Sequence, residues 1–181
     1  MSNAFELLGL PVRLILSRET LQQAFREAGK RLHPDAGGDE QSFAELQRAS
    51  EVLQSPSRRL KHWLEIGGHP LESRGAISPS IMTCFGRVSE VCQGAEALAR
   101  KREAAKSALG LALLEGETHA CREQLEATIR EVQTSIEEAC AAFADLDAGV
   151  VDVAAACAVY RDLAFLEKWL TSLRALYARL A

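Results

Sequence analysis

The sequence of 181 residues lacks the features of a membrane or secreted protein. It contains no run of 18 apolar residues, so no helix is expected to span a bilayer. Near the start of the chain, the charges of Glu6 and Arg13 interrupt the apolar residues, which is not the pattern of a secretory signal. We therefore predict a cytoplasmic protein that has no membrane partner.

The cysteines do not occur in the sequence patterns typical of metal-binding or redox-active cysteines. The five cysteines are odd in number and include no CxxC pair: Cys84, Cys92, Cys121, Cys140 and Cys157. The alternative use of these residues is a metal site, but no spacing among cysteines and histidines suits one. We expect small, buried, hydrophobic side chains in a reducing compartment, and we predict no metal and no cofactor.

Motifs of catalysis are missing as well. No nucleophile–base pair can be recognised, and Gly37-Gly38 is not followed by the Lys-Ser/Thr of a phosphate-binding loop. An enzyme would need some such convergent set of polar groups. The sequence therefore predicts that the protein is not an enzyme.

Aromatic residues make up only 6% of the chain, whereas alanine and leucine are abundant, which favours helix. The net charge of −4 argues against nucleic acid as a partner, and this charge is unevenly spread. Residues 1–74 carry ten basic and ten acidic side chains, while residues 75–181 carry 11 and 15. The N-terminal part can therefore present a local basic face.

A helix is predicted from Glu19 to Leu32, with Ser17 in the N-cap position. Its apolar residues recur at i, i+4, i+7 and i+11 and form one face: Leu21, Phe25, Ala28 and Leu32. At 100° per residue, Arg26 and Lys30 point nearly opposite that face, and Arg31 lies on its flank. This helix should therefore present a basic outer surface.

The helix leads directly into His33-Pro34-Asp35, where the proline ends it. A short glycine-bearing loop and a second helix, from about Glu40 to Gln54, follow. A third, short helix is predicted from Arg58 to Ile66, capped by Ser57 and closed by the glycines that follow it. The tripeptide is either a recognition turn or a helix-ending turn whose aspartate caps the loop.

Turn-forming residues at 67–79 predict a domain boundary, so we expect one domain over residues 1–74 and another over 75–181. The second contains three long helical patterns, separated by residues 115–117 and 147–149. Heptad-like apolar stripes on consecutive helices with short connections predict an elongated antiparallel three-helix bundle. The fold class is therefore all-α.

The two helices around His33-Pro34-Asp35 resemble a J-domain, the module with which co-chaperones activate the ATPase of DnaK-type chaperones. The resemblance implies that six residues contact the chaperone: His33, Pro34, Asp35, Arg26, Lys30 and Arg31. Asp35 would meet an arginine-bearing surface, and the basic residues an acidic one. The sequence departs from the usual pattern at Leu32, where tyrosine is common, and at Ala36, where lysine often follows.

The whole chain is similar in layout to the HscB family of iron–sulfur co-chaperones. Phe5-Glu6-Leu7-Leu8-Gly9-Leu10-Pro11 and the run at 161–168 carry this resemblance, and no Gly/Phe-rich linker or CxxC repeat of a general DnaJ-type holdase is present. The resemblance implies a DnaK/HscA-type chaperone as one partner and an IscU-type iron–sulfur scaffold as another. The scaffold-binding residues would be Ile81, Met82 and Phe85.

The acidic part of that scaffold-binding face is missing, because Gly86 and Ser89 stand where carboxylates are expected. Ile81 and Phe85 continue an apolar stripe, which favours core, whereas Met82 lies off it and is predicted to be exposed. We therefore predict a non-enzymatic co-chaperone whose first domain stimulates the ATPase of a DnaK-type chaperone and whose second domain delivers an iron–sulfur scaffold protein to it. The alternative is a different client, or a complex that the acidic bundle anchors.

Overall fold

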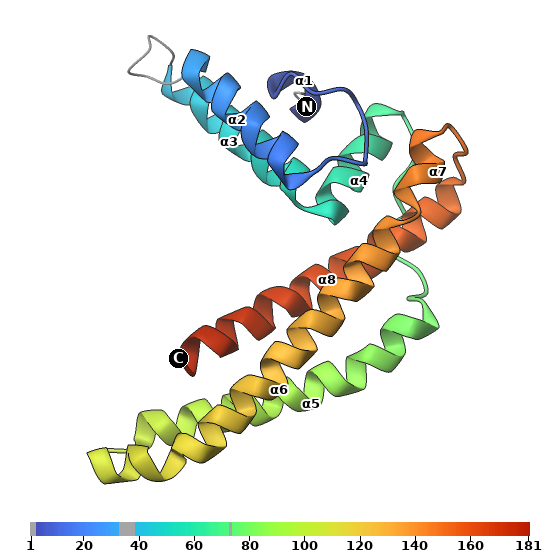
Figure 1. Cartoon of the computed structure of the whole chain (residues 1–181). Helices are drawn as coiled ribbons and strands as arrows, with labels where there is room; N and C mark the ends of the chain where they lie inside the picture. Colours follow the sequence, from blue (N-terminus) through green and yellow to red (C-terminus); the bar gives the residue numbers. More distant parts are fainter. Residues whose placement is uncertain (1–2, 33–38, 73) are drawn as a thin grey trace. The chain divides into compact units, whose positions relative to one another are not determined.

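The computed structural model describes residues 3–32, 39–72 and 74–181, and every regular element in these ranges is an α-helix (Figure 1). The all-α fold class predicted from the sequence is therefore confirmed. Contacts divide the chain into two compact units. The first comprises Met1–Gly75 and Cys140–Leu163, and the second comprises Ala76–Ala139 and Ala164–Ala181.

The first unit is built on two long helices, α2 and α3, that lie side by side (Figure 1). Its helices are α1 (Ala4–Leu7), α2 (Arg18–Leu32), α3 (Glu40–Gln54), α4 (Pro56–Ile66), α7 (Phe143–Asp147) and the start of α8 (Val153–Arg179). The apolar faces of α1, α2 and α3 form one core, with these residues buried: Phe5, Leu8, Leu21, Ala24, Ala28, Leu46, Ala49 and Leu53. Burial of this shared core holds the short α1 in place.

Side-chain caps fix where these helices begin. The Ser17 Oγ accepts a hydrogen bond from the Thr20 N–H at 3.1 Å, so the predicted N-cap of α2 is confirmed. The cap of α4 is Ser55, whose Oγ accepts from the Arg58 N–H, so the prediction of Ser57 was wrong by two residues. The reason is Pro56, which fits the first position of a helix because that position needs no N–H donor.

The end of α4 follows the prediction made from its two glycines. Gly68 has a φ of +70°, and its N–H bonds to the Glu65 carbonyl at 3.2 Å. The His69 N–H reaches back to the Leu64 carbonyl at 2.9 Å. This pair of bonds is a Schellman motif, which requires a left-handed residue and so favours glycine.

Residues from the second half of the chain complete the first unit. The Asp147 carboxylate accepts hydrogen bonds from the backbone N–H groups of Leu14, at 2.8 and 3.1 Å, and Ile15, at 2.9 Å. The Arg59 guanidinium lies 5.7 Å from the centre of the buried Phe143 ring. The α7 segment therefore closes part of the surface of this unit.

The segment after α4 is held against the start of α8. The Arg161 guanidinium donates to the Glu72 carbonyl at 2.8 Å, and the Glu72 N–H donates to the Cys157 sulfur at 3.3 Å. Gly75, at a φ of +153°, lies under the same arginine, and a Cβ there would be 2.9 Å from its Cζ. This close approach explains the glycine at that position.

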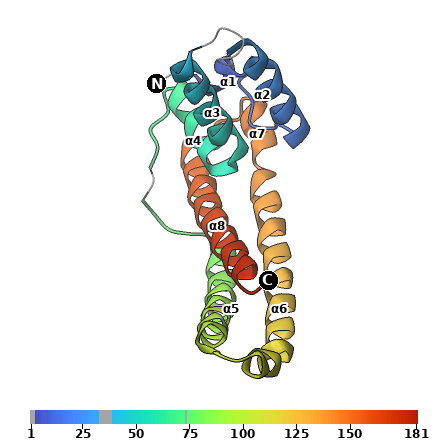
Figure 2. The same cartoon turned by 90° about the vertical axis from the view of Figure 1, so that its left-hand side faces the viewer.

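The second unit is an antiparallel bundle of α5 (Pro79–Ala104), α6 (Ala108–Cys140) and the later part of α8, which lie side by side in both views (Figures 1 and 2). Its core residues come from all three helices: Ile81, Val88, Ala95, Leu98, Ala99, Leu125, Val132, Leu166, Leu173, Leu176 and Leu180. The predicted three-helix arrangement is thus confirmed.

The position of the first turn in the bundle differs from the prediction. The chain turns at residues 105–107, and Gly116 lies inside α6. Ala105 leaves the helical conformation, and the Ser107 Oγ caps α6 by accepting from the Gly110 N–H at 3.1 Å. A helical glycine costs only about 1 kcal/mol relative to alanine, so a long helix with tertiary contacts tolerates it.

For the same reason α5 continues through Gly86 and Gly94. The second turn was expected at residues 147–149, but α6 already ends at Cys140, and α7 lies between the two long helices. The domain boundary at residues 74 and 75 stays a prediction, because compactness does not measure whether a segment folds alone.

Candidate partner-binding surfaces

The outer face of α2 carries the predicted cations. Arg26, Lys30 and Arg31 are all exposed, while Leu21, Ala24 and Ala28 on the opposite side are buried. The Arg26 guanidinium donates to the Gln23 side-chain oxygen at 2.8 Å, and the Gln23 amide donates to the Glu27 carboxylate. Arg26 is therefore steadied on the helix surface, and the three cations stay accessible to a partner.

His33, Pro34 and Asp35 lie outside the described residues. On either side of them, α2 ends at Leu32 and α3 begins at Glu40. Lys30 and Arg31 lie in the last turn of α2. Positive side chains are favourable there because the carbonyl end of a helix carries a partial negative charge. On the other side the Asp39 carboxylate caps α3 and accepts from the Ser42 N–H at 2.8 Å. Hydrogen bonds from Ser42 lower the pKa of Asp39.

A second candidate surface lies on α5 and α8 in the bundle. Met82 is 58% exposed and Phe85 is 51% exposed, so the predicted exposure of Met82 is confirmed. Ile81 is only 6% exposed and belongs to the core. A side chain with so little surface cannot form a contact of its own, which corrects its inclusion among the docking residues. Ile81 instead supports the helix that displays Met82 and Phe85.

Two aromatic residues of α8 extend this surface. The rings of Phe85 and Trp169 are 5.9 Å apart between centroids, and those of Phe165 and Trp169 are 6.1 Å apart. Sequence analysis missed Phe165 and Trp169 because they lie off the apolar stripe of α8. Their spacing of four residues on one helix face was a usable signal.

We define the aromatic surface as Met82, Phe85, Phe165 and Trp169. A groove of about 420 Å³ continues from it between α5 and α8, and its lining includes the single acidic residue Glu96. No carboxylate stands at positions 86 and 89, and the nearby Arg87 pairs with Glu131 at 3.0 Å. The surface is therefore mainly apolar, with little charge of its own.

The cysteines offer no clear chemistry. Cys157 is buried, and the other four are partly buried. Burial raises the pKa of Cys84, Cys92 and Cys121, which disfavours the reactive thiolate. Within the described ranges, no three His, Cys, Asp or Glu side chains gather in a way that could hold a metal ion. Nor does any helix there have the length and apolarity needed to cross a membrane.

Comparison with known proteins identifies the N-terminal segment. Residues 3–62 match the model of the DnaJ domain. A 55-residue stretch is 44% identical to Chaperone protein dnaJ A6 of Oryza sativa, covering 30% of this chain and 13% of that protein. Chaperone protein DnaJ 1 of Nocardia farcinica is 34% identical over 76 residues, covering 40% and 19%. The chain therefore spans less than a fifth of the length of these relatives.

A solved structure matches nearly the full length. Chaperone HscB from Vibrio cholerae superposes with a TM-score of 0.64 at 23% identity, covering 99% of this chain and 100% of that one. This likeness establishes the fold, a DnaJ domain followed by a helical bundle. The resemblance inferred from the sequence, in layout and in the N-terminal domain, is confirmed.

Proposed function

We propose that this chain is a J-domain co-chaperone that stimulates ATP hydrolysis by a DnaK-type chaperone. The observation that carries the proposal is the DnaJ domain match at residues 3–62. In the sequence, His33-Pro34-Asp35 lies within this range and follows directly after α2, whose outer face is basic. Exposed cations close in sequence to an aspartate are suited to a partner that has both acidic and arginine-bearing surfaces.

The division of labour follows from the chemistry of each group. Asp35 forms charge-assisted hydrogen bonds with the arginine-bearing surface of the chaperone, while Arg26, Lys30 and Arg31 attract its acidic surface. The residues that hydrolyse ATP belong to the chaperone. This chain acts as a ligand that favours the hydrolysing conformation, so the proposal gives it neither a catalytic residue nor a cofactor.

The bundle is proposed to deliver a client, an IscU-type iron–sulfur scaffold. The aromatic surface supports this role, because large exposed apolar side chains on a folded domain favour a binding site over a purely structural one. Gly86 and Ser89 bring no charge to it, so we expect the scaffold to bind mainly through apolar contacts. The resulting affinity should be lower than that of relatives with acidic residues there.

A second candidate keeps the fold and the chaperone partner but changes the client. The missing carboxylates favour it, because charge complementarity is what usually separates one partner from another. In this case the aromatic surface binds another client or anchors the protein in a complex. A binding titration with the iron–sulfur scaffold of the same organism separates the two candidates.

The test of the co-chaperone function is Asp35→Asn in single-turnover ATP hydrolysis by the cognate DnaK-type chaperone. We expect stimulation to be lost while thermal unfolding is unchanged. Asp39→Asn serves as the matched control, because Asp39 caps α3 at the other end of the same connection. Stimulation by Asp35→Asn equal to that of the parent would refute the function. Unfolding of this variant would instead indicate a structural cap.

A further inference from the structure

Two leucines at the beginning of α6 do not belong to the bundle core. Leu109 is 72% exposed and Leu113 is 76% exposed, although both are large and apolar. The core face of α6 lies elsewhere on the helix, through Thr118, Leu125 and Val132. Leu109 and Leu113 are one turn apart and so form a single apolar ridge on the outer side.

The ridge continues along α6 as a stripe of small residues. Gly116 and Ala120 follow at i+7 and i+11 from Leu109, and both are exposed. Beyond them lies a groove of about 650 Å³ between α5 and α6. Small side chains form much of its lining: Gly94, Ala95, Ala120, Cys121 and Ala127. One face of the bundle thus carries both a leucine ridge and a hollow.

Charge is distributed along the same face. Lys106 lies in the turn just before α6 and the ridge, whereas Arg87, Glu90 and Glu123 line the groove. Arg87 pairs with Glu131 at 3.0 Å, and Glu123 lies 3.4 Å from the His119 ring nitrogen. Other cations nearby are already compensated: Lys101 pairs with Glu117 at 3.3 Å and Arg102 with Glu115 at 3.1 Å. Among the residues that the structure describes, no ion pair involves Lys106 or Glu90. Lys106 therefore gives the ridge end a positive charge, and in the groove lining the two carboxylates outnumber the one cation.

The ridge on one copy of this face is complementary to the small residues on a second copy that runs in the opposite direction. We propose that the occupant of this face is a second copy of the same chain, packed antiparallel along α6. A pairing centred between Leu114 and Glu115 places Leu113 of each copy opposite Gly116 of the other. In the same register, Leu109 lies opposite Ala120, so large side chains meet small ones at both levels.

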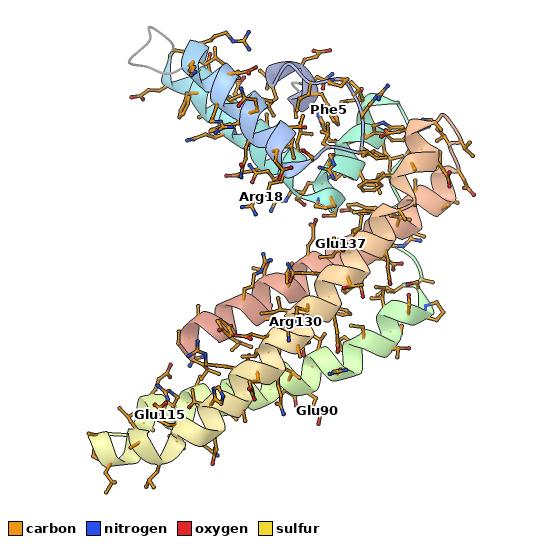
Figure 3. The ribbon with its side chains drawn as sticks, in the orientation of Figure 1. Phe5, Arg18, Glu90, Glu115, Arg130 and Glu137 are labelled. Carbon is orange, nitrogen blue, oxygen red and sulfur yellow. The ribbon has the colours of Figure 1, made fainter. Side chains whose placement is uncertain are left out.

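The register also brings the charges together. Lys106 of one copy comes to the level of Glu123 of the other, at the acidic edge of the groove, and the two-fold axis repeats this contact. Figure 3 shows Glu115, at the centre of the proposed contact, near the start of α6, and Glu90 farther along the bundle. A two-fold interface must be self-complementary, and this face meets that requirement in shape and in charge.

The interface is expected to be small. From Leu109 to Ala120 the stripe is about 17 Å long at 1.5 Å per residue, so each copy contributes about three helical turns. Contacts of this size fall below the roughly 1,200 Å² of a standard stable interface. The copies should therefore exchange rapidly between monomer and dimer as concentration changes.

Sedimentation equilibrium of the full chain between about 5 and 500 µM tests the proposal, a range suited to an interface below standard size. The parent should change from monomer towards dimer. The double variant Leu109→Gln/Leu113→Gln should raise the dimer dissociation constant at least about tenfold. Gly116→Leu should do the same, although a Cβ there has no neighbour within 4 Å in the single chain, so the monomer should remain folded.

The charges provide a second, independent arm. Lys106→Glu should weaken the dimer, and adding Glu123→Lys should restore it, because the pair is then reversed. Val150→Gln, a substitution of an exposed aliphatic residue in the first unit, is the control and should have no effect. A parent that stays monomeric throughout, or a dimer indifferent to Leu109, Leu113 and Gly116, would overturn the proposal.

Discussion

The side-chain Nε2 of His62 accepts a hydrogen bond from the backbone N–H of Ala4 at 2.9 Å, across 58 positions of the sequence. The imidazole is buried and stacks on Phe5, with ring centroids 5.8 Å apart. A nitrogen that accepts cannot carry a proton, so this contact requires the neutral ring. His62 therefore ties α1 to α4 only while it is uncharged.

This bond predicts a pH dependence of stability. Burial lowers the pKa of His62 in the folded protein; Glu65 opposes the shift and the N-terminal amine adds to it. The unfolded chain, with a histidine pKa of about 6.5, takes up a proton that the folded state resists. The stabilisation is thus full above that pH and is lost as the pH falls. Denaturant unfolding at pH 7.5 and pH 5.5 should show the decrease.

The matched variants for this prediction are His62→Gln and His119→Gln. The first removes the buried titrating ring and should flatten the pH dependence between 5.5 and 7.5, at a cost of about 1–3 kcal/mol if the Ala4 N–H loses its acceptor. His119 is exposed on α6, so His119→Gln serves as the control for replacing a surface histidine. Equal pH profiles for the parent and His62→Gln would contradict the assignment.

Charge reversal of Arg26 and Lys30 together should weaken binding to the chaperone. These exposed side chains act through a screened field, so we expect roughly a tenfold loss of affinity at low salt and a smaller one at high salt. A salt series of binding titrations measures the effect. Reversal of Arg100 and Arg174, which are exposed in the other unit, is the control. The same affinity at every salt concentration would exclude electrostatic steering by α2.

The two neighbours Ile81 and Met82 should respond in opposite ways. Ile81→Ala removes a core side chain and should lower the free energy of unfolding by about 2–5 kcal/mol. Met82→Ala should change it by less than about 0.5 kcal/mol, because the side chain is exposed. Scaffold binding should show the reverse dependence, with loss of affinity for Met82→Ala. Unchanged binding by that variant would remove Met82 from the docking surface.

Asp147 should matter for the stability of the first unit. Asp147→Ala leaves the N–H groups of Leu14 and Ile15 without their acceptor, and hydrogen bonds to a charged group contribute about 1.5–3 kcal/mol. Denaturant unfolding measures the loss. The nearby Asp145 is exposed, and Asp145→Ala should have little effect. Equal stability of the two variants would show that water replaces the carboxylate at no cost.

Much of the local structure was determined by the sequence itself. The apolar spacing of Leu21, Ala28 and their neighbours predicts the buried face of α2, since a helix returns to the same side every 3.6 residues. The Ser17 cap and the glycines after Ile66 give helix ends because their effect depends only on adjacent backbone groups. The same periodicity predicted that the Met82 side chain is exposed to solvent.

Other features depended on the tertiary structure. The turn at residues 105–107 competes with Gly116, and local propensities that differ by about 1 kcal/mol cannot decide between them. Contacts of Arg102 with Glu115 and Thr118 across the turn favour the observed position. Phe85 and Trp169, whose rings are neighbours, lie on different helices and are 84 residues apart in the sequence. No local pattern on one helix can therefore predict their contact.

The hydrogen bond from the Leu14 N–H to the Asp147 carboxylate shows the same division most clearly. Each residue alone reads as an ordinary part of a loop or helix end, and 133 positions separate them. The sequence determined the helices and their faces, because those follow from contacts within one or two turns. The tertiary structure decided which faces and ends meet, because long-range pairing depends on how all the buried surfaces are satisfied together.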